Sequence, residues 1–373
     1  GNIYTFDNTE ITNTIPNDEA GAPSYHWYTY TSAWYLTRVQ SRNGLEKLNF
    51  SYYYPSAKQS VYQNALQNQS AIYSYQTSAC TAINPVRSGE NSYSTPPTTQ
   101  INRVFLQSIT LVRDGFTMLN LIEFGSVENQ RQDLWLADFA GERRLDTVKI
   151  YAFHNGTKSL ISHHRLFYSY FPSEGTGLGD LRLRLDSVKE MSTKVGTPDK
   201  PAYGFRYDNN VLPNRYTTKI DHWGYHNENG QNSLIPTVVA ELDGMDRTYG
   251  RDAIREPSFD KAKYAVLQKI IYPTGGYTEF LYGAHSSEVG GLRINGINDY
   301  AFNNTVVKRK VYNYELPIRG PKPVYQTLTK RTDYGDGCFG VCNSQTPMWC
   351  MNSATSILTI ATNSIYGLGS VAG

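Results

Sequence analysis

Apolar and polar residues alternate along much of the chain with a period of two, the period of a β-strand that places one face on a core. Residues 48–52 (LNFSY) show this alternation clearly. Two β-rich runs flank Asn43-Gly44 within residues 34–54. Asn-Gly tolerates the positive φ angles of a type I′ turn, so this stretch predicts a β-hairpin.

The same design recurs along the chain. Residues 267–282 (LQKIIYPTGGYTEFLY) form a second predicted hairpin with its turn at Gly275 and Gly276. Its opening pattern, Leu, any residue, a polar residue and then Val or Ile, occurs in five copies, which begin at Leu36, Leu106, Leu145, Leu185 and Leu267. Four copies are followed by an aromatic, any residue and Tyr: Phe50/Tyr52, Tyr168/Tyr170, Phe205/Tyr207 and Phe280/Tyr282. The spacing is irregular, which favours a sheet of successive hairpins over a strict solenoid.

The opening pattern conflicts with a regular strand, because residues three apart lie on opposite faces. Either both faces of the sheet are covered, or a bulge lies between the Leu and the Val. The sequence leaves both explanations open.

Helix signals are scarce. Residues 257–266 predict a turn or two of helix that begins at Pro257 and Ser258, and residues 56–69 predict a weaker second helix. Loops are expected at about 77–100 and 173–179, which are rich in Ser, Thr, Pro and Asn. The predicted fold is therefore all-β, a large twisted sheet of successive β-hairpins with very little helix.

Composition narrows the class of protein. The chain has 373 residues, of which 30 are Tyr, 39% are apolar and 18% are charged, so it is not a disordered chain. The net charge is only +2 and the charges are scattered, so we expect no nucleic-acid partner. No apolar run approaches the ~18 residues of a membrane helix, so we expect no membrane span.

Four stretches carry a resemblance to a known family: residues 34–44 (WYLTRVQSRNG), 212–227 (LPNRYTTKIDHWGYHN), 267–282 and 289–294 (VGGLRI). In this order they resemble the region that precedes or opens the repeats in large exported YD-repeat (RHS-repeat) proteins of the Bacteroidetes type. The resemblance covers most of residues 1–332, the predicted hairpin-built region. Residues 333–373 are expected to be a separate Ser-, Asn- and Gly-rich segment that contains cysteines.

The resemblance implies a β-sheet strip that coils into a shell, sometimes around a C-terminal toxin or other cargo, in a secreted or cell-surface protein. Such a shell has no catalytic centre of its own. The expected partners are the rest of a longer chain, a cargo domain, or other exported or surface proteins. The self-cleavage motif of toxin-bearing members, of DPxG type, does not occur in this sequence.

The densest chemical cluster is Asp221, His222, Trp223 and Tyr225. It could hold a metal or a catalytic base, but a His pair at this spacing binds zinc only on a helix. Gly224 favours a turn instead, so we expect a structural aromatic corner packed on the sheet. No metal or other cofactor is predicted.

Two covalent features follow from the resemblance to exported proteins. Cys338, Cys342 and Cys350 are expected to form one disulfide among themselves, and the remaining thiol pairs with Cys80 or stays free. Thr147 and Ser187 match an O-glycosylation pattern of Asp, then Ser or Thr, then an apolar residue.

No Gly-x-Ser-x-Gly elbow, His-Glu-x-x-His helix or phosphate loop occurs in the sequence, and no enzyme activity is predicted. The leading expectation is a non-enzymatic structural or enclosing scaffold. The alternative is a surface carbohydrate-binding module that stacks sugars on exposed Tyr and Trp. Burial of Trp27, Trp34, Trp135 and Trp223 would remove that alternative.

Overall fold

The structure is a computed structural model. It describes residues 1–15, 28–55, 59–62, 66–78, 81–82, 86–94, 98–113, 116–128, 131–133, 143–154, 157–177, 179–215, 217–229, 234, 236–242, 245–249, 253–285, 290–314, 327–333 and 349–362. Most of the described residues lie in β-strands and the helix among them covers four residues, which confirms the all-β class.

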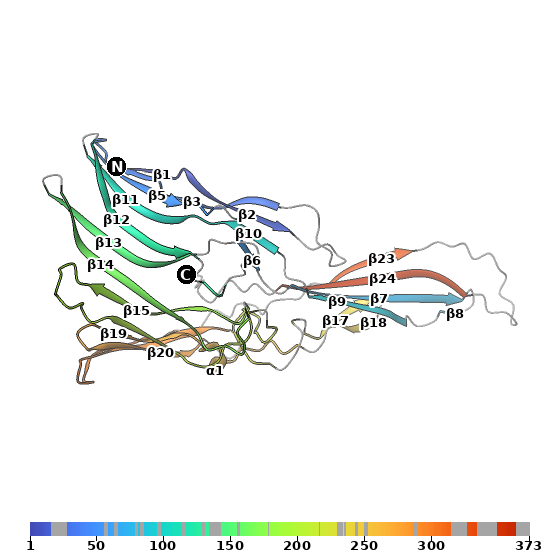
Figure 1. The fold of residues 1–373 in the computed structure, drawn as a ribbon. Coiled ribbons are helices and arrows are strands. Elements are labelled where there is room, and N and C mark those ends of the chain that lie inside the picture. Colours follow the sequence, from blue (N-terminus) through green and yellow to red (C-terminus); the bar gives the residue numbers. More distant parts are fainter. Residues whose placement is uncertain are drawn as a thin grey trace.

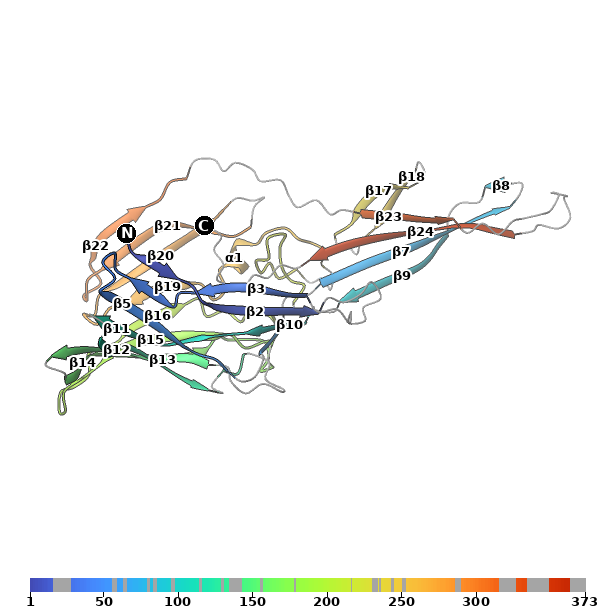
Figure 2. The same ribbon diagram turned by 90° about the horizontal axis from the view of Figure 1, so that it is seen from above.

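The largest element among the described residues is an antiparallel sheet of 13 strands. In spatial order these are β1 (Ile3–Thr5), β4 (Arg38–Gln40), β5 (Glu46–Tyr53), β11 (Phe105–Arg113), β12 (Phe116–Glu128), β13 (Arg143–His154), β14 (Thr157–Tyr170), β15 (Leu183–Met191), β16 (Tyr203–Tyr207), β19 (Leu267–Ile271), β20 (Tyr277–Ala284), β21 (Leu292–Tyr300) and β22 (Val306–Val311). Spatial order follows chain order apart from inserted segments, so the predicted sheet of successive hairpins is confirmed. Figures 1 and 2 show it as one curved wall, with β1 and β5 at the top and β19 and β20 at the bottom of Figure 1.

Smaller sheets are built from the insertions and the C-terminal part. One has the strand order β3 (Tyr28–Tyr35), β2 (Asn8–Ile15), β10 (Thr98–Asn102) and β6 (Gln59–Tyr62). A second has the order β23 (Thr327–Asp333), β24 (Trp349–Thr362), β7 (Leu66–Ser78) and β8 (Thr81–Ala82), and β9 (Val86–Ser94) also pairs with β7. A third consists of the hairpin of β17 (Val238–Leu242) and β18 (Met245–Tyr249). The sheet of β7 and β24 extends beyond the curved wall (Figure 1). Since β24 pairs with β7 along its length, this sheet joins both predicted regions; the boundary at 332/333 stays a prediction.

Bulges resolve the conflict in the opening pattern. Tyr168 lies opposite Leu185 while the preceding Phe167 lies opposite Ser187, so Asp186 is an extra residue in β15. The register skips one residue at the same place in three further copies, at Gln107, Asp146 and Gln268. One extra residue reverses the alternation of faces, so the Leu and the Val of each copy lie on the same side of their strand.

A tyrosine hydroxyl accompanies five strand openings of the main sheet, those at Leu36, Leu145, Leu185, Leu267 and Ile294. The closing tyrosine of one strand donates a hydrogen bond to the backbone carbonyl of the Leu or Ile that opens the preceding neighbour. The bonds are Tyr52–Leu36 (2.7 Å), Tyr168–Leu145 (2.7 Å), Tyr207–Leu185 (3.0 Å), Tyr282–Leu267 (2.5 Å) and Tyr314–Ile294 (2.9 Å). We call this series the tyrosine ladder. Because a bulge interrupts the backbone ladder, the hydroxyl supplies a donor where the backbone pairing is disturbed.

The closure at Tyr168 and Tyr170 differs from the others in register. The sequence pattern assigned it to Tyr168 and Tyr170, but the tyrosine that donates to Leu145 is Tyr168. The Tyr170 hydroxyl instead accepts a hydrogen bond from the backbone N–H of Gln132 at 2.7 Å. The pattern of aromatic, any residue and Tyr fits Tyr170 and not Tyr168, because Leu166 stands two residues before Tyr168. Only the pairing of the strands identifies the bonding tyrosine.

The hairpin turns use one left-handed residue rather than two. At Asn43-Gly44 only Gly44 has a positive φ, of 76°, so the predicted type I′ turn is wrong. Ser41 N donates to Glu46 O, which makes the loop four residues long, and a longer loop is built around a type I turn. At the second turn Gly275 has φ 87°, and Tyr272 N donates to Gly276 O at 2.8 Å.

Local signals for helix and loop were partly misleading. The helix predicted within 257–266 is confirmed as α1 (Phe259–Ala262) after Ser258. The helix predicted at 56–69 is wrong, because this stretch contains β6 and the start of β7. The expected loop at 77–100 contains β8, β9 and part of β10. Pairing with distant strands, such as β10 with both β2 and β6, overrides the weak local preference.

The main sheet is thin. Nearly every residue of β13 and β15 is half-buried rather than alternately buried and exposed. Among the described residues, the buried apolar side chains are small in number: Val104, Leu212, Ile220, Leu234, Ala253 and Ala262. Strand-to-strand contacts therefore stabilise this sheet more than a covered core does.

We predict that Tyr207→Phe destabilises the chain by about 1 kcal/mol, the net value of one hydrogen bond, because its hydroxyl donates to Leu185 O. Tyr203→Phe is the matched control, since Tyr203 lies in the same strand, is 45% exposed and is not a ladder residue. Urea unfolding measures both. Equal free energies of unfolding for the two variants would contradict a stabilising ladder.

Candidate functional site

The predicted cluster at residues 221–225 forms a tight turn. Asp221 N donates to Tyr225 O at 2.8 Å, and Asp221 Oδ1 accepts hydrogen bonds from the backbone N–H groups of Trp223 and Tyr225 at 2.9 Å each. An isolated bridge between Ile220 and His226 flanks the turn. Asp favours such turns because its carboxylate accepts from N–H groups just ahead of it in the chain.

The Asp221 carboxylate is fully buried. The Arg255 guanidinium, also buried, donates to Asp221 O and Leu234 O at 2.7 Å each. Among the described residues no group donates to Asp221 Oδ2, and a Cβ at Gly290 would collide with this oxygen. Burial raises the pKa of Asp221 to about 6, although the N–H bonds and the charge of Arg255 act in the opposite direction.

The aromatic rings of the cluster lie against the start of β21. Trp223 meets His222 edge to face, with ring centroids 5.8 Å apart. The Tyr225 ring lies over Gly291, which directly precedes β21 and has φ 98°. The cluster thus connects a long excursion of the chain, between β16 and β19, to the main sheet.

The two imidazoles of the cluster engage different neighbours. His226 Nδ1 lies 2.9 Å from Lys219 O, and its ring packs on Tyr264 at 5.3 Å, whereas His222 contacts Trp223. Burial lowers the pKa of His226. Within the described part of the chain, no group of three or more His, Cys, Asp or Glu could hold a metal ion.

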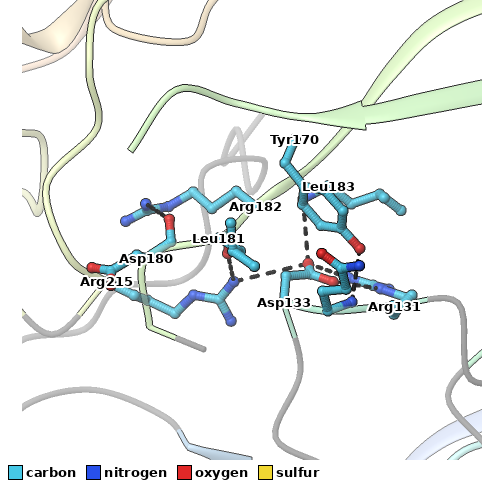
Figure 3. Close-up of polar contacts among 9 residues, drawn as sticks. Arg131, Asp133, Tyr170, Asp180, Leu181, Arg182, Leu183 and Arg215 are labelled. Atoms are coloured by element: carbon cyan, nitrogen blue, oxygen red, sulfur yellow. Dashed lines mark hydrogen bonds and ion pairs between the residues drawn. The ribbon is translucent and has the colours of Figure 1, made fainter. Parts of the chain in front are cut away.

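A second buried carboxylate was missed in the sequence. Asp133 is 3% exposed, and Arg131 binds it with two hydrogen bonds of 3.0 and 2.7 Å (Figure 3). Leu183 N donates to Asp133 Oδ2 at 3.3 Å, and Arg215 Nη2 lies 4.0 Å from the same oxygen. Burial alone would raise the pKa of Asp133, but Arg131 outweighs it and holds the pKa below its ordinary value.

Figure 3 shows that this cluster joins the start of β15 to the chain around Arg215. Arg215 Nη2 donates to Leu181 O at 3.1 Å, and Arg182 Nη1 donates to Asp180 O at 3.2 Å. Burial, and then the nearby charge of Arg215, lower the pKa of Arg182 to about 10. These contacts hold the segment before β15 against the segment around Arg215.

A sequence signal for the Asp133 cluster exists. Arg, any residue and Asp occur at 131–133, 144–146, 184–186, 206–208 and 331–333. At the first three places the Arg pairs with the Asp, at 2.7, 2.9 and 2.8 Å, whereas Asp208 accepts hydrogen bonds from Asn210 and Gln268. Residues two apart on an extended chain share a face, so the pattern favours an ion pair but does not ensure one.

Thr147 and Ser187 directly follow the bulge residues Asp146 and Asp186. Both side chains are half-buried, and the Thr147 hydroxyl lies against Gly125 of the adjacent strand. Their glycosylation stays a prediction. Cys80, Cys338 and Cys342 lie outside the described residues, as does the side chain of Cys350 in β24.

The tryptophans differ in exposure. Trp34 is 63% exposed in β3, an edge strand, and Tyr30 on the same strand is 51% exposed. Trp223 is half-buried, while Trp27 and Trp135 lie outside the described residues.

No family model, curated protein or solved structure matches the chain. In the part of the chain that the structure describes, none of the helical residues forms a segment long and apolar enough to cross a membrane.

We predict that Asp221→Asn removes a pH dependence of stability between about pH 4 and 7. The folded wild type keeps the Asp221 proton up to a pKa of about 6, whereas the unfolded chain loses it near its ordinary value of 3.8. The free energy of unfolding of the wild type therefore falls as the pH rises through this window, by about 3 kcal/mol in total at 1.36 kcal/mol per pKa unit.

Asn keeps an acceptor oxygen for the two backbone N–H groups but carries no charge. Urea unfolding of both proteins across this range measures the effect, and the difference between them cancels all other titrating groups. Parallel stability curves would refute the assignment to Asp221.

Proposed function

We propose that the chain is a non-enzymatic scaffold of the YD-repeat kind, which forms a wall around cargo or a scaffold at the cell surface of a secreted or surface protein. The tyrosine ladder carries this proposal. It repeats one contact in five pairs of neighbouring strands between Leu36 and Tyr314. Four of its residues lie in the stretches on which the resemblance rests: Leu36, Leu267, Tyr282 and Ile294.

The burial of the main strands supports a wall rather than a compact domain. Nearly every residue of β13 and β15 is half-buried, and few of the described apolar side chains are fully buried. A curved sheet with two half-buried faces has room for cargo or for a further layer of chain on either face.

The last strand of the sheet is suited to accept another strand. All residues of β22 are exposed, and Val307 and Val311 are 71% and 65% exposed. In earlier strands the closing tyrosine also lies opposite the next opening Leu, as Tyr207 lies opposite Leu267. Tyr314 follows β22 and donates its hydroxyl to Ile294 O, as Tyr207 donates to Leu185 O. In this proposal a Leu-x-x-Val strand from the rest of a longer chain, or from another exported protein, pairs here.

We predict that Arg309→Pro reduces self-association through the β22 edge. Tyr312 N donates inward to Asn295 O of β21, and backbone N–H groups alternate along a strand, so the N–H of Arg309 faces outward. Proline at this position blocks a new strand without removing a bond to β21. Light scattering across a wide range of protein concentrations measures the association.

Lys310→Pro is the control, because the N–H of Lys310 faces β21 and its loss should lower stability instead. The proposal of an open edge fails if the wild type is a monodisperse monomer at every concentration, or if Arg309→Pro associates as the wild type does.

The exposure of Trp34 favours one second candidate, carbohydrate binding. The register of β3 with β2 skips Ser32, between Tyr30 and Trp34. This extra residue places the two rings on opposite faces of β3, so Trp34 is the candidate ring and Tyr30 does not extend it. An exposed aromatic face stacks on the apolar face of a sugar ring.

For this candidate we expect reproducible glycan-array hits that Trp34→Ala abolishes. Phe302→Ala is the matched control, because Phe302 is 78% exposed in a different part of the chain. Hits that persist in Trp34→Ala, or no hits at all, would remove carbohydrate binding by this strand.

A further inference from the structure

One position of the tyrosine ladder lacks its tyrosine. In β14, Tyr168 lies opposite Leu185 at the bulge of the next strand. The residue of β12 in the same relation to the next strand, opposite Leu145, is Ser126. By this register, a tyrosine at position 126 would reach Leu106 O, as Tyr168 reaches Leu145 O.

A cavity lies at this position. It has a volume of about 210 Å³. Its lining residues are Tyr53, Phe105, Leu106, Gln107, Phe124, Gly125, Ser126 and Arg143. Phe105, Leu106 and Gln107 come from β11 around its bulge, and Phe124, Gly125 and Ser126 come from β12 beside it.

The corresponding position between β13 and β14, where the ladder tyrosine is present, shows which side chain would fill this cavity. The Tyr168 ring lies by Arg144, Leu145 and Asp146, with the Arg144 guanidinium carbon 5.2 Å from the ring centroid and the hydroxyl on Leu145 O. Phe105, Leu106 and Gln107 are the corresponding residues in β11, and all three line the cavity. The cavity therefore lies where a ladder tyrosine would lie, and its lining residues in β11 correspond to those around Tyr168.

The cavity also holds a cationic group that suits an aromatic ring. Arg143 Nη1 donates to Ser126 Oγ at 3.2 Å and to Ser126 O at 3.3 Å. Its guanidinium carbon lies 3.7 Å from the centroid of the Tyr53 ring. Arg stacks on aromatic faces by cation–π attraction, so an added ring in the cavity would have Arg143 and Phe124 among its neighbours.

We infer that the cavity between β11 and β12 is a binding site for a phenol group, which inserts where Ser126 replaces the ladder tyrosine. The ring fills the space beside Phe105 and Phe124, and the hydroxyl is directed to Leu106 O. This site goes beyond the scaffold role and does not depend on it. The phenol comes either from a small molecule or from a tyrosine of another polypeptide.

The test is binding of p-cresol to the full chain, followed by NMR. We expect saturable binding that stabilises the chain against heat, as ligands of the folded state do. Ser126→Tyr should abolish this binding, with at least about a tenfold loss of affinity, and should raise the melting temperature without ligand. Thr193→Tyr is the control, because Thr193 is exposed in a bend outside the cavity, and this variant should keep the binding.

Two further probes distinguish the source and the chemistry of the ligand. N-acetyl-tyrosinamide that binds as well as p-cresol supports a polypeptide tyrosine, and binding of p-cresol alone supports a small phenol. Toluene, which lacks the hydroxyl, should bind more weakly than p-cresol.

The inference is overturned if p-cresol does not bind, or if Ser126→Tyr folds and binds it as the wild type does. If Ser126→Tyr does not fold, the location of p-cresol on the wild type tests the inference. Nuclear Overhauser effects from p-cresol to Leu106 and Phe124 then support the site, and effects only to other residues overturn it.

Discussion

The hydrogen bond from a tyrosine hydroxyl to the carbonyl of the residue before a bulge is the contact on which the main sheet depends. A bulge disturbs backbone pairing and exposes a carbonyl that needs a donor. Tyr168 and Tyr207 provide that donor from the adjacent strand. Each of these tyrosines also lies opposite the opening Leu of the following strand. The repeated contact thus fixes register on both sides and lets a thin sheet extend without a deep apolar core.

The two buried carboxylates anchor the irregular segments to this sheet by different means. Asp133 keeps its charge, because Arg131 binds it with two hydrogen bonds at close range. Asp221 receives backbone N–H bonds, and the buried Arg255 binds its main-chain oxygen rather than its carboxylate. Desolvation therefore dominates at Asp221 and raises its pKa to about 6. One anchor is insensitive to mild acid, and the other becomes neutral in it.

The sequence was sufficient to predict the hairpins and the all-β class, because alternation and Gly turns are local signals. It was not sufficient for features that depend on strand register. The copy at Ile294 was missed because Ile and Gly296 replace the expected Leu and polar residue, yet Tyr314 bonds to it in the same way. Residues 56–69 have a weak helical pattern but form strands, because β10 and β24 pair with them. The burial of Asp133 could not be predicted, because it depends on contacts with Leu183 and Arg215, which are distant in the chain.

The pairing of β7 with β24 has a consequence for biosynthesis. β7 is made long before β24, and the two pair over the full length of both strands. Contacts between such remote segments form slowly, since a long loop must close first. During translation the edge of β7 that pairs with β24 therefore stays open until β24 has been synthesised. In that interval it is open to aggregation, so a holding chaperone would protect the nascent chain most at this segment.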